Sequence, residues 1–396
     1  MIKTNDKSRC CGCGTCGIVC PVNCISFIPD ALGCLYPSID RSKCIKCRKC
    51  EAVCPLRREF TDLKRGIRAF AAFSSDNKIR FRGSSGGVFE SAASWVLENS
   101  GSVYACKFDK NFELKCFEAN TLDEIIELTK SKYLQSSCVD AFPVMRKKIQ
   151  EGLPVLFCST PCQVAAFQSY IGTLSEADNL YLLDFFCHGV PSQWFFDKCR
   201  KYIEDKKKIK ITGYEFRTKK HRGATPHYLT LKYFKNGKER IRKSPFFMDP
   251  FYLGFQKYIT MRDSCYQCPY GSGGHCGDIT IGDFHEIDKY VNGINRFDGV
   301  STVLTNTQKG EKLWKKIEGG MVSYEMSIEQ LIEDGQIYAG GTKEPEQRAE
   351  FLHDMETLEF TVVADKWLNS KHEWKKAIYY RLPFVIRKTI KGLMRL

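Results

Sequence analysis

The chain has 396 residues, of which 43% are hydrophobic and 27% charged, as in an ordinary globular protein of two or three domains. Its net charge of +14 is concentrated at one end, where nine Lys and Arg and a single Glu lie between 366 and 396, so we expect no nucleic-acid binding. The first residues lack an apolar signal segment, and no apolar stretch approaches the ~18 residues that a membrane span needs.

Cysteine is the unusual part of the composition, with 21 residues. In a reducing compartment such as the cytoplasm, clustered cysteines bind metals or carry out redox chemistry more often than they form disulfides. Because the number is odd, complete pairing within the chain is excluded. We therefore expect a cytoplasmic protein whose thiols serve metals or electrons.

Residues 10–21 (CCGCGTCGIVCP) and 44–55 (CIKCRKCEAVCP) both contain the motif C-x2-C-x2-C-x3-C-P, displaced by 34 residues. Three thiolates at this spacing wrap one face of a 4Fe–4S cubane, and the fourth, before the proline, reaches the other cluster. Zinc is the alternative, but it usually occupies paired C-x2-C knuckles. We predict two crossed clusters, one on Cys10, Cys13, Cys16 and Cys54 and the other on Cys20, Cys44, Cys47 and Cys50.

Residues 1–57 as a whole resemble the bacterial two-cluster ferredoxins, which implies a small α+β, ferredoxin-like domain. The remaining cysteines of this segment, Cys11, Cys24 and Cys34, are interpreted as packing thiols. Residues 58–68 are polar and basic and are interpreted as a linker. A ferredoxin domain fused to a longer chain usually delivers electrons to it.

After the linker, residues 68–75 predict a strand, and residues 103–108 predict the next strand. Between them, Ser84, Ser85, Gly86 and Gly87 precede apolar residues at helical spacing. A Gly/Ser turn that enters a helix offers N–H groups to a phosphate, although an ordinary helix start has the same pattern. The turn fits neither the dinucleotide fingerprint nor the P-loop.

Two later segments, 153–171 and 180–203, each predict strand, turn and helix, which indicates an α/β sheet with ligand-binding loops at its carboxyl edge. Cys162 and Cys187 lie on such loops. A further group, Cys265, Cys268 and Cys276, contains a C-x2-C knuckle. With a fourth thiol from Cys187 or Cys162, it predicts a third 4Fe–4S cluster; a zinc knuckle or buried thiols are the alternatives. The strand around ITIGDF places Asp283 at the sheet edge.

Six ordered motifs over about residues 1–310 resemble one family, the beta subunit of coenzyme F(420) hydrogenase/dehydrogenase, in the bacterial form with a two-cluster ferredoxin head. The motifs are RGSSGGVF (82–89), SKYLQS (131–136), FCSTPCQ (157–163), DFFCHGVPS (184–192), FRTK (216–219) and CYQCPY…DITIGDF (265–284). The resemblance implies an α/β flavin-binding catalytic domain that holds FAD and a 4Fe–4S cluster. Its third-cluster ligands would be Cys187, Cys265 and Cys268, with Cys162 or Cys276.

By the same resemblance, the flavin would be lined by the Ser84–Gly87 turn, by the segment from Ser131, and by the turn that precedes the helix after Cys158. The expected flavin contacts are Ser84, Ser85, Gly86, Gly87, Lys132, Tyr133, Gln135, Thr160, Pro161 and Gln163. We divide the chain into the ferredoxin domain (1–57), the linker (58–68), a flavin-binding part (69–150), a part with cysteine loops (151–345) and a basic amphipathic tail (346–396).

A flavin would connect one-electron clusters with a two-electron hydride step. His188 is a candidate proton donor, or a histidine satisfied in its turn. The basic run Arg217, Lys219, Lys220, His221 and Arg222 could hold an anionic substrate, or be a solvated face. The tail around 374–396 either contacts an anionic membrane surface or packs on its own domain.

We interpret the chain as an iron–sulfur flavoprotein oxidoreductase that works with a redox partner protein. Its substrate would be the deazaflavin coenzyme F(420) or another organic molecule, including a lipid-linked intermediate of surface-polysaccharide synthesis. The alternative is a ferredoxin-type electron-transfer adaptor that has no substrate of its own. Bound flavin distinguishes the two.

Overall fold

The computed structural model describes residues 6–57, 67–219, 228–272, 274–335 and 342–369, together with 378–379, 382 and 386. The strands are β1 (Ile25–Pro29), β2 (Leu35–Ile39), β3 (Arg68–Ser74), β4 (Ser102–Phe108), β5 (Leu114–Ala119), β6 (Val155–Cys158), β7 (Leu180–Phe185), β8 (Lys210–Thr218), β9 (Tyr228–Lys235), β10 (Lys238–Pro245), β11 (Ile279–Asp283), β12 (Ser301–Thr305) and β13 (Met321–Met326). Within these ranges no helix is long and apolar enough to cross a membrane.

The helices are α1 (Thr15–Ile18), α2 (Lys49–Ala52), α3 (Asn77–Arg82), α4 (Val88–Glu98), α5 (Leu122–Leu128), α6 (Phe142–Gln150), α7 (Pro161–Ile171), α8 (Gln193–Lys207), α9 (Pro250–Gln256), α10 (Asp263–Tyr266), α11 (Gln308–Ile317), α12 (Ile328–Glu333), α13 (Arg348–Thr357) and α14 (Phe360–Trp367). The strands and helices expected from residue 68 to residue 203 are confirmed, as is the strand that ends at Asp283.

An eight-stranded mixed sheet forms the centre of the body, in the order β13-β3-β12-β11-β7-β6-β4-β5. The four middle strands β11, β7, β6 and β4 are parallel, and the flanking pairs are antiparallel. Since strands from 68–119 and from 155–326 alternate within this sheet, the two parts that we separated at residue 150 form one structural unit. The result is an α/β body, as the strand–turn–helix pattern predicted.

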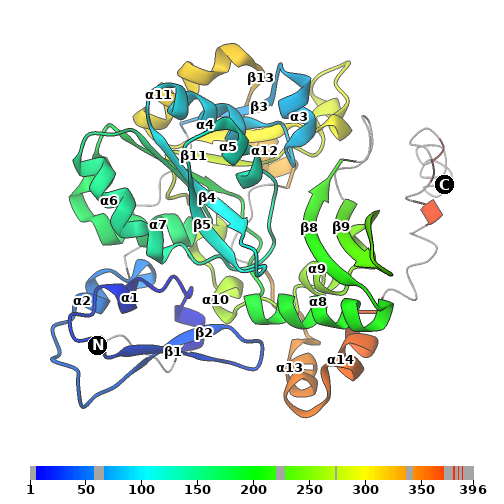
Figure 1. Cartoon of the computed structure of the whole chain (residues 1–396). Coiled ribbons are helices and arrows are strands. Elements are labelled where there is room, and N and C mark those ends of the chain that lie inside the picture. Colours follow the sequence, from blue (N-terminus) through cyan, green and yellow to red (C-terminus); the bar gives the residue numbers. More distant parts are fainter. Residues whose placement is uncertain are drawn as a thin grey trace.

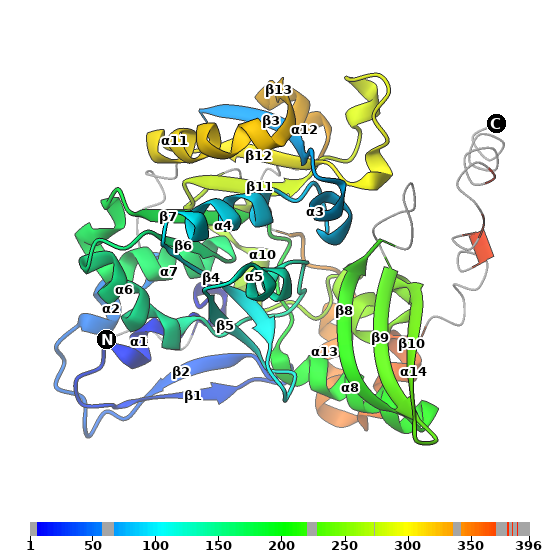
Figure 2. The ribbon, with the colours of Figure 1, turned by 45° about the horizontal axis from the view of Figure 1, so that its top comes forward.

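Both faces of the central strands are buried, and successive side chains join different cores because they point to opposite faces of a sheet. In β6, Leu156 packs with α4, α5 and α11 on one face, whereas Val155 and Phe157 pack with α6 and α7 on the other. Figures 1 and 2 show the helices on the two sides of the sheet. The carboxyl ends of the parallel strands therefore lie at one edge, where β6 and β7 lead into the loops of Cys162 and Cys187.

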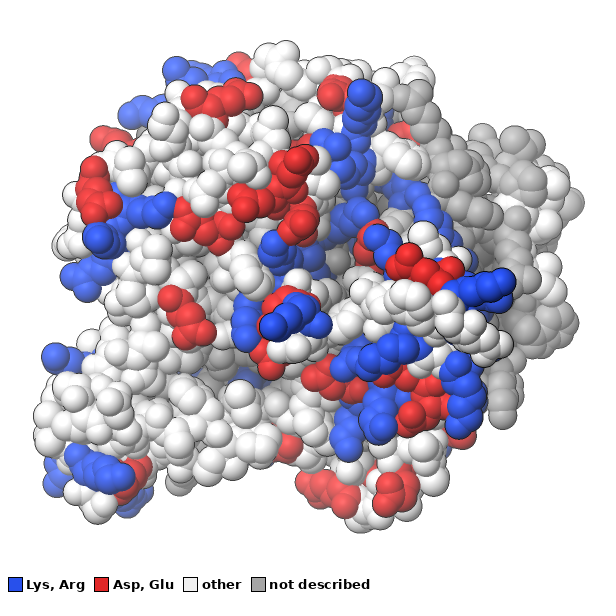
Figure 3. All heavy atoms as spheres, in the orientation of Figure 1, with Lys and Arg blue, Asp and Glu red and all other residues white. Residues whose placement is uncertain are grey.

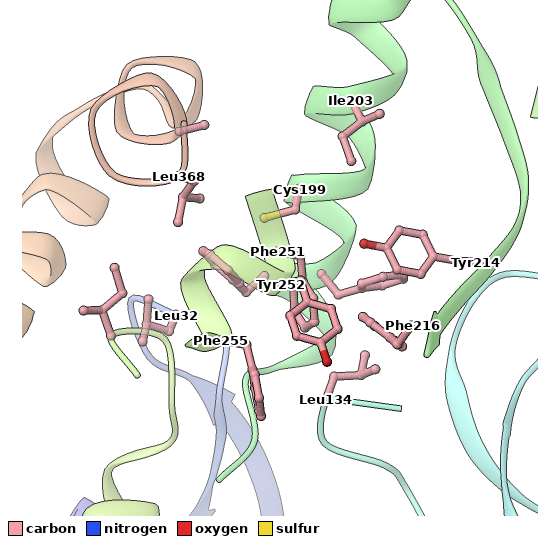
Figure 4. Close-up of a cluster of buried hydrophobic side chains, with 14 of the residues drawn as sticks. Leu32, Leu134, Cys199, Ile203, Tyr214, Phe216, Phe251, Tyr252, Phe255 and Leu368 are labelled. Carbon is pink, nitrogen blue, oxygen red and sulfur yellow. The ribbon is translucent and has the colours of Figure 1, made fainter. Parts of the chain in front are cut away.

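A smaller antiparallel sheet, β10-β9-β8, stands beside the body (Figure 2). Its β9–β10 hairpin turns at Asn236 and Gly237, which both have positive φ, as a two-residue Asn-Gly turn requires. The sheet packs on α8, α9 and α14 through an aromatic core that also receives Leu32 from the N-terminal domain (Figure 4). Burying that leucine ties the small domain to the rest of the chain.

The segment that we described as a tail begins with two packed helices. In α13 and α14, Phe351, Val363 and Ala364 are fully buried in the same aromatic core, followed by Leu368. Residues 348–368 therefore belong to the body. The amphipathic stretch 374–396 lies outside the described residues except for 378–379, 382 and 386.

Candidate functional site

The sequence repeat of the N-terminal domain is also a repeat of backbone conformation. Helix α2 begins and ends 34 residues after α1, and the backbone is left-handed at matching positions, namely Gly12 and Gly14 in one copy and Lys46 and Arg48 in the other. Each cysteine loop thus closes into one helical turn in the same way. The β1–β2 hairpin, paired from Ile25↔Ile39 to Pro29↔Leu35, connects the two copies.

A pocket in this domain collects one of the two predicted cysteine sets. Cys20, Cys44, Cys47 and Cys50 line it, with Val22, Ile25, Ile39 and Ile45 as apolar walls. Three of these thiols come from the second motif and one from the first, as a crossed arrangement requires. The donor set and its apolar surroundings fit a 4Fe–4S cluster.

The other predicted set, Cys10, Cys13, Cys16 and Cys54, lies where the small domain meets the body. Burial raises the pKa of the Cys16 thiol, and the charges of Cys13, Cys10 and Cys54 add to this effect. The four thiols therefore lie close enough together for their charges to interact. Cys13 and Cys54 also pack against the buried cluster around α6 and α7.

A second pocket joins cysteines from three loops of the body. Cys162 lies in the first turn of α7, Cys187 follows β7, and Cys265 and Cys268 flank the end of α10. These four line one pocket together with Cys11 of the N-terminal domain. Cys276 does not line it; Cys276 is buried nearby, and its backbone N–H donates to Asp184.

The spacing of the cysteine sulfur atoms distinguishes a site for an iron–sulfur cluster from a site for a single metal ion. Four irons lie between the ligands of a cubane, so its cysteine sulfurs stand farther apart than the ligands of one zinc ion. Within the described ranges, the one three-thiol group whose sulfurs all lie within 4.8 Å of one another is elsewhere, at Cys106, Cys116 and Cys138. Among the described residues, no three sulfurs of either pocket lie within 4.8 Å of one another, although Cys20 Sγ and Cys24 Sγ in the first pocket are 3.5 Å apart. This spacing is compatible with 4Fe–4S clusters.

A buried arginine connects the N-terminal domain to the cysteine loops of the body. Arg262, 1% exposed, donates to the carbonyl oxygens of Cys10 at 3.1 Å and Leu35 at 2.7 Å. Its Nε donates to Gln135 Oε1 at 3.0 Å. Gln135 in turn donates to the carbonyl oxygens of Cys11 and Gly12. Arg262 and Gln135 therefore hold the first cysteine loop against the second pocket.

The Ser84–Gly87 turn lies against the sheet and is held by two buried cations. Arg217 Nη2 donates to the Ser84 carbonyl oxygen at 3.1 Å, and Lys219 Nζ donates to that of Ser85 at 2.8 Å. Gly86 N donates to Ser301 Oγ, and Ser131 N donates to Ser84 Oγ. The turn thus contacts the segment that begins at Ser131.

Arg217 is paired with Asp283 at 2.5 Å, and its buried Nε has no hydrogen-bond partner among the described residues. An unpartnered buried N–H is costly unless an acceptor completes it. Figure 3 shows Lys and Arg side chains gathered around the hollow between the upper body and the top of β8 and β9. We call this surface, together with Arg217 and Lys219, the cationic recess. Lys220, His221 and Arg222 lie outside the described residues.

The other expected flavin residues are distributed around these two places. Lys132 Nζ donates to the carbonyl oxygens of Leu128 and Thr129 at the end of α5. Tyr133 packs in the aromatic core, with its ring centroid 4.7 Å from that of Phe255.

The remaining ones lie at the start of α7. Thr160 and Pro161 line the second cysteine pocket, and the buried Gln163 donates to the Ser136 carbonyl oxygen. The structure therefore brings together the Ser84 turn and Ser131, whereas Gln135, Thr160 and Pro161 lie toward the cysteines.

His188 adjoins Cys187, at the edge of the second pocket. Burial lowers the pKa of its imidazole, and the Asp283 carboxylate partly opposes this effect. A neutral ring at pH 7 keeps one donor and one acceptor nitrogen. The carbonyl oxygen of His188 accepts from Thr342 at 2.6 Å.

The roles of two residues at the second cysteine pocket were not predicted from the sequence. Cys11, interpreted there as a packing thiol, lines the pocket of the body, and the neighbouring thiols of Cys13 and Cys162 raise its pKa well above the usual value, so it lies close to both cysteine sets. Arg262 had not been considered. The one signal for it was its place, three residues before the knuckle cysteine Cys265.

Two parts of this chain match families of known proteins. Residues 153–329 match the family described as the C-terminal part of the coenzyme F(420) hydrogenase/dehydrogenase beta subunit, and residues 36–59 match a 4Fe–4S binding domain. No curated protein matches the chain. A solved structure, from the F(420)-reducing nickel–iron hydrogenase complex of Methanosarcina barkeri, is similar with a TM-score of 0.44 and 17% identity, over 77% of this chain and 91% of that chain.

Proposed function

Because residues 153–329 match the C-terminal part of the coenzyme F(420) hydrogenase/dehydrogenase beta-subunit family and residues 36–59 match a 4Fe–4S binding domain, we propose that the chain is an iron–sulfur flavoprotein oxidoreductase. Electrons would enter or leave through the N-terminal domain and reach a substrate bound to the body. The family relation by itself supports an iron–sulfur electron-transfer protein of the oxidoreductase type. The flavin, the substrate and the residue roles are the proposed part.

One observation carries the proposal, namely that thiols of the N-terminal domain and of the body share a pocket. Cys11 lines it beside Cys162, Cys187, Cys265 and Cys268, and the nearby Cys13 thiol raises the pKa of Cys11. In this proposal Cys10, Cys13, Cys16 and Cys54 hold the nearer cluster of the N-terminal domain, and the four body thiols hold the third cluster. The short connection through Cys11 would couple the two.

FAD is the proposed second cofactor, because it supplies chemistry that exchanges single electrons on one side and hydride equivalents on the other. The Ser84–Gly87 turn, Ser131, Arg217 and Lys219 are its proposed anchors. The unpartnered Nε of Arg217 supports an anion there, as does the buried Lys219, whose lowered pKa an anion would raise again. His188, neutral at pH 7, would hold a proton between the cysteine pocket and Asp283.

The proposed substrate is an F(420)-like coenzyme or another organic hydride acceptor, including a lipid-linked one, in the cytoplasm or at the inner membrane surface. A redox partner protein would exchange electrons with the N-terminal domain. An adaptor without a substrate is the second candidate. It is favoured if the cationic recess binds no flavin.

Flavin content of the anaerobically purified chain tests the proposal. After acid precipitation, the supernatant should contain about one FAD per chain, beside about twelve irons in the three proposed clusters. Arg217→Met should lower the FAD content and leave the iron content unchanged, whereas Arg240→Met, on the exposed β10, should change neither. If iron is present in full but no flavin binds even after incubation with FAD, the chain is an electron-transfer adaptor.

A further inference from the structure

Three cysteines that belong to neither pocket converge at the edge of the large sheet. Cys106 on β4 and Cys116 on β5 are direct partners in the antiparallel register. Cys138 follows Ser137, which pairs with β5 from its outer side: Cys116 N donates to the Ser137 carbonyl oxygen at 2.9 Å. Hydrogen-bonded backbone thus fixes all three positions.

The sulfur spacing is that of ligands to one ion. The three sulfurs lie within 4.8 Å of one another, and Cys106 Sγ is 3.5 Å from Cys138 Sγ. A tetrahedral zinc ion, with Zn–S bonds of about 2.3 Å, holds its sulfurs about 3.8 Å apart. The group therefore needs only small side-chain rotations to bind an ion, whereas it is too tight for a cubane.

Hydroxyl groups surround the third thiol. Ser159 Oγ lies 3.5 Å and Ser136 Oγ 3.6 Å from Cys138 Sγ. Cys138 and Ser159 are 0% and 3% exposed. A serine oxygen or one water can thus complete a four-coordinate site, which is the number that zinc prefers.

The charges also balance at this place. Three thiolates and one divalent cation leave a net charge of −1 in a largely buried site, which is costly unless a positive group lies near. The Lys132 ammonium acts electrostatically on Cys106 and supplies that charge. The neighbouring carbonyl oxygens of Leu128 and Thr129 hold the ammonium in place.

We propose that Cys106, Cys116 and Cys138 bind one thiophilic divalent cation, such as zinc, separately from the iron–sulfur clusters. Binding displaces three thiol protons and involves no change of oxidation state. The ion joins β4 and β5 to the segment 131–138, which contains Ser131 and Gln135. It thereby fixes the segment that contacts the Ser84 turn at one end and the N-terminal domain at the other.

The test uses the full-length, iron-replete chain, purified without oxygen and equilibrated with Zn²⁺ before free metal is removed. Zinc and iron are then counted in the same samples. We expect one zinc per chain in the wild type and in the control Cys199→Ser, a buried cysteine of the aromatic core. Cys138→Ser and Cys116→Ser should lose the zinc and keep the iron, and zinc-edge X-ray absorption should show three sulfur ligands in the wild type.

Three results would overturn the proposal. The first is that the iron-replete wild type retains no zinc. The second is that the Cys116→Ser and Cys138→Ser variants retain as much zinc as Cys199→Ser. The third is that the bound zinc has four sulfur ligands, which would place it in a cluster pocket. The zinc count does not depend on flavin. Its failure is therefore distinguishable from failure of the proposed oxidoreductase function, which leaves zinc bound and flavin absent.

Discussion

Burial decides the protonation state of Lys219, which is 4% exposed and donates to the Ser85 carbonyl oxygen. Burial is the largest cause that lowers its pKa to about 7. Lys219 is faced by Arg217 on β8, Arg80 on α3, Asp283 on β11 and Asp298, of which the two arginines lower the pKa further and the two aspartates oppose them. An anion bound beside Lys219 would restore its proton.

This lysine predicts a pH dependence of stability. The unfolded chain keeps the proton up to about pH 10, whereas the folded chain releases it near 7, so the free energy of unfolding rises with pH across this window. In Lys219→Met this contribution is absent. Thermal unfolding under argon at about pH 7 and about pH 9 should show the wild type gaining stability relative to the variant. Parallel pH profiles would mean that Lys219 titrates normally in the folded chain.

Arg262 is the residue that we expect to matter most for the contact between the N-terminal domain and the body. Arg262→Met removes three donated hydrogen bonds and leaves buried carbonyl oxygens without a donor. The loss should be about 2–4 kcal/mol of unfolding free energy. It should also lower the reduction potential of the nearest cluster, because a positive charge favours the reduced form.

Denaturant unfolding and redox titration check this prediction. Arg240→Met, on the exposed strand β10, is the matched control and should change the unfolding free energy by no more than about 0.5 kcal/mol. Arg262→Lys keeps the charge but not the planar set of donors. It should therefore preserve the potential better than the stability. Equal behaviour of Arg262→Met and Arg240→Met would refute the positioning role.

At the scale of elements, the Ser84 turn depends on the close approach of Gly86 to two strands. A Cβ atom at Gly86 would overlap the carbonyl oxygen of Ala72 on β3 and lie 2.9 Å from the backbone nitrogen of Ser301 on β12. Gly86→Ala should therefore displace the turn and reduce FAD binding. Gly319→Ala, where the added Cβ meets nothing within 4 Å, is the control. FAD retained on gel filtration should fall in the first variant only.

Sequence reasoning was strongest where ligands are local. The spacing of Cys44, Cys47 and Cys50 is set by one loop, so the motif predicted that these thiols converge. The strand–turn–helix units around β6 and β7 were also predictable, because apolar runs and turn residues alternate there. Residues 267–278 were harder, since nothing in the spacing indicated that Cys268 lines the pocket and Cys276 does not.

Contacts between distant segments could not be predicted in this way. Gln135 was assigned to the flavin by resemblance, yet its side chain contacts the first cysteine loop, and its role at a flavin stays a prediction. Cys106, Cys116 and Cys138 come together through strand pairing across three segments, which no short motif encodes. Arg262 carried no motif and becomes recognisable only through its burial and its partners.

At the scale of the whole molecule, the N-terminal domain contacts both the aromatic core and the cysteine pocket of the body. Leu32 enters the aromatic core, and Cys11 lines the cysteine pocket of the body. The domain therefore contacts the body at two separate places, and Figure 1 shows it packed against the body. A fixed contact suits electron transfer, because the distance between the proposed centres then stays constant.

The proposed third cluster can be tested separately, through the iron content of a variant of one of its ligands. Cys265→Ser should lower the iron content by about four atoms per chain and leave the two N-terminal clusters in place, because its sulfur lines only the second pocket. Cys199→Ser, buried in the aromatic core, should keep all the iron. Unchanged iron in Cys265→Ser, with an intact absorbance spectrum, would remove this cysteine from the ligand set.

The central claim is that electrons pass from the N-terminal domain through the cysteine pocket to a flavin in the body. Its most direct test is anaerobic stopped-flow mixing of the FAD-loaded chain with a reduced ferredoxin, followed at the flavin absorbance. We predict rapid flavin reduction in the wild type and in Cys199→Ser, and a severe loss of rate in a Cys265→Ser variant that still holds FAD and both N-terminal clusters. An equal rate in all three proteins would contradict the account, because the electrons would then bypass the pocket on which it rests.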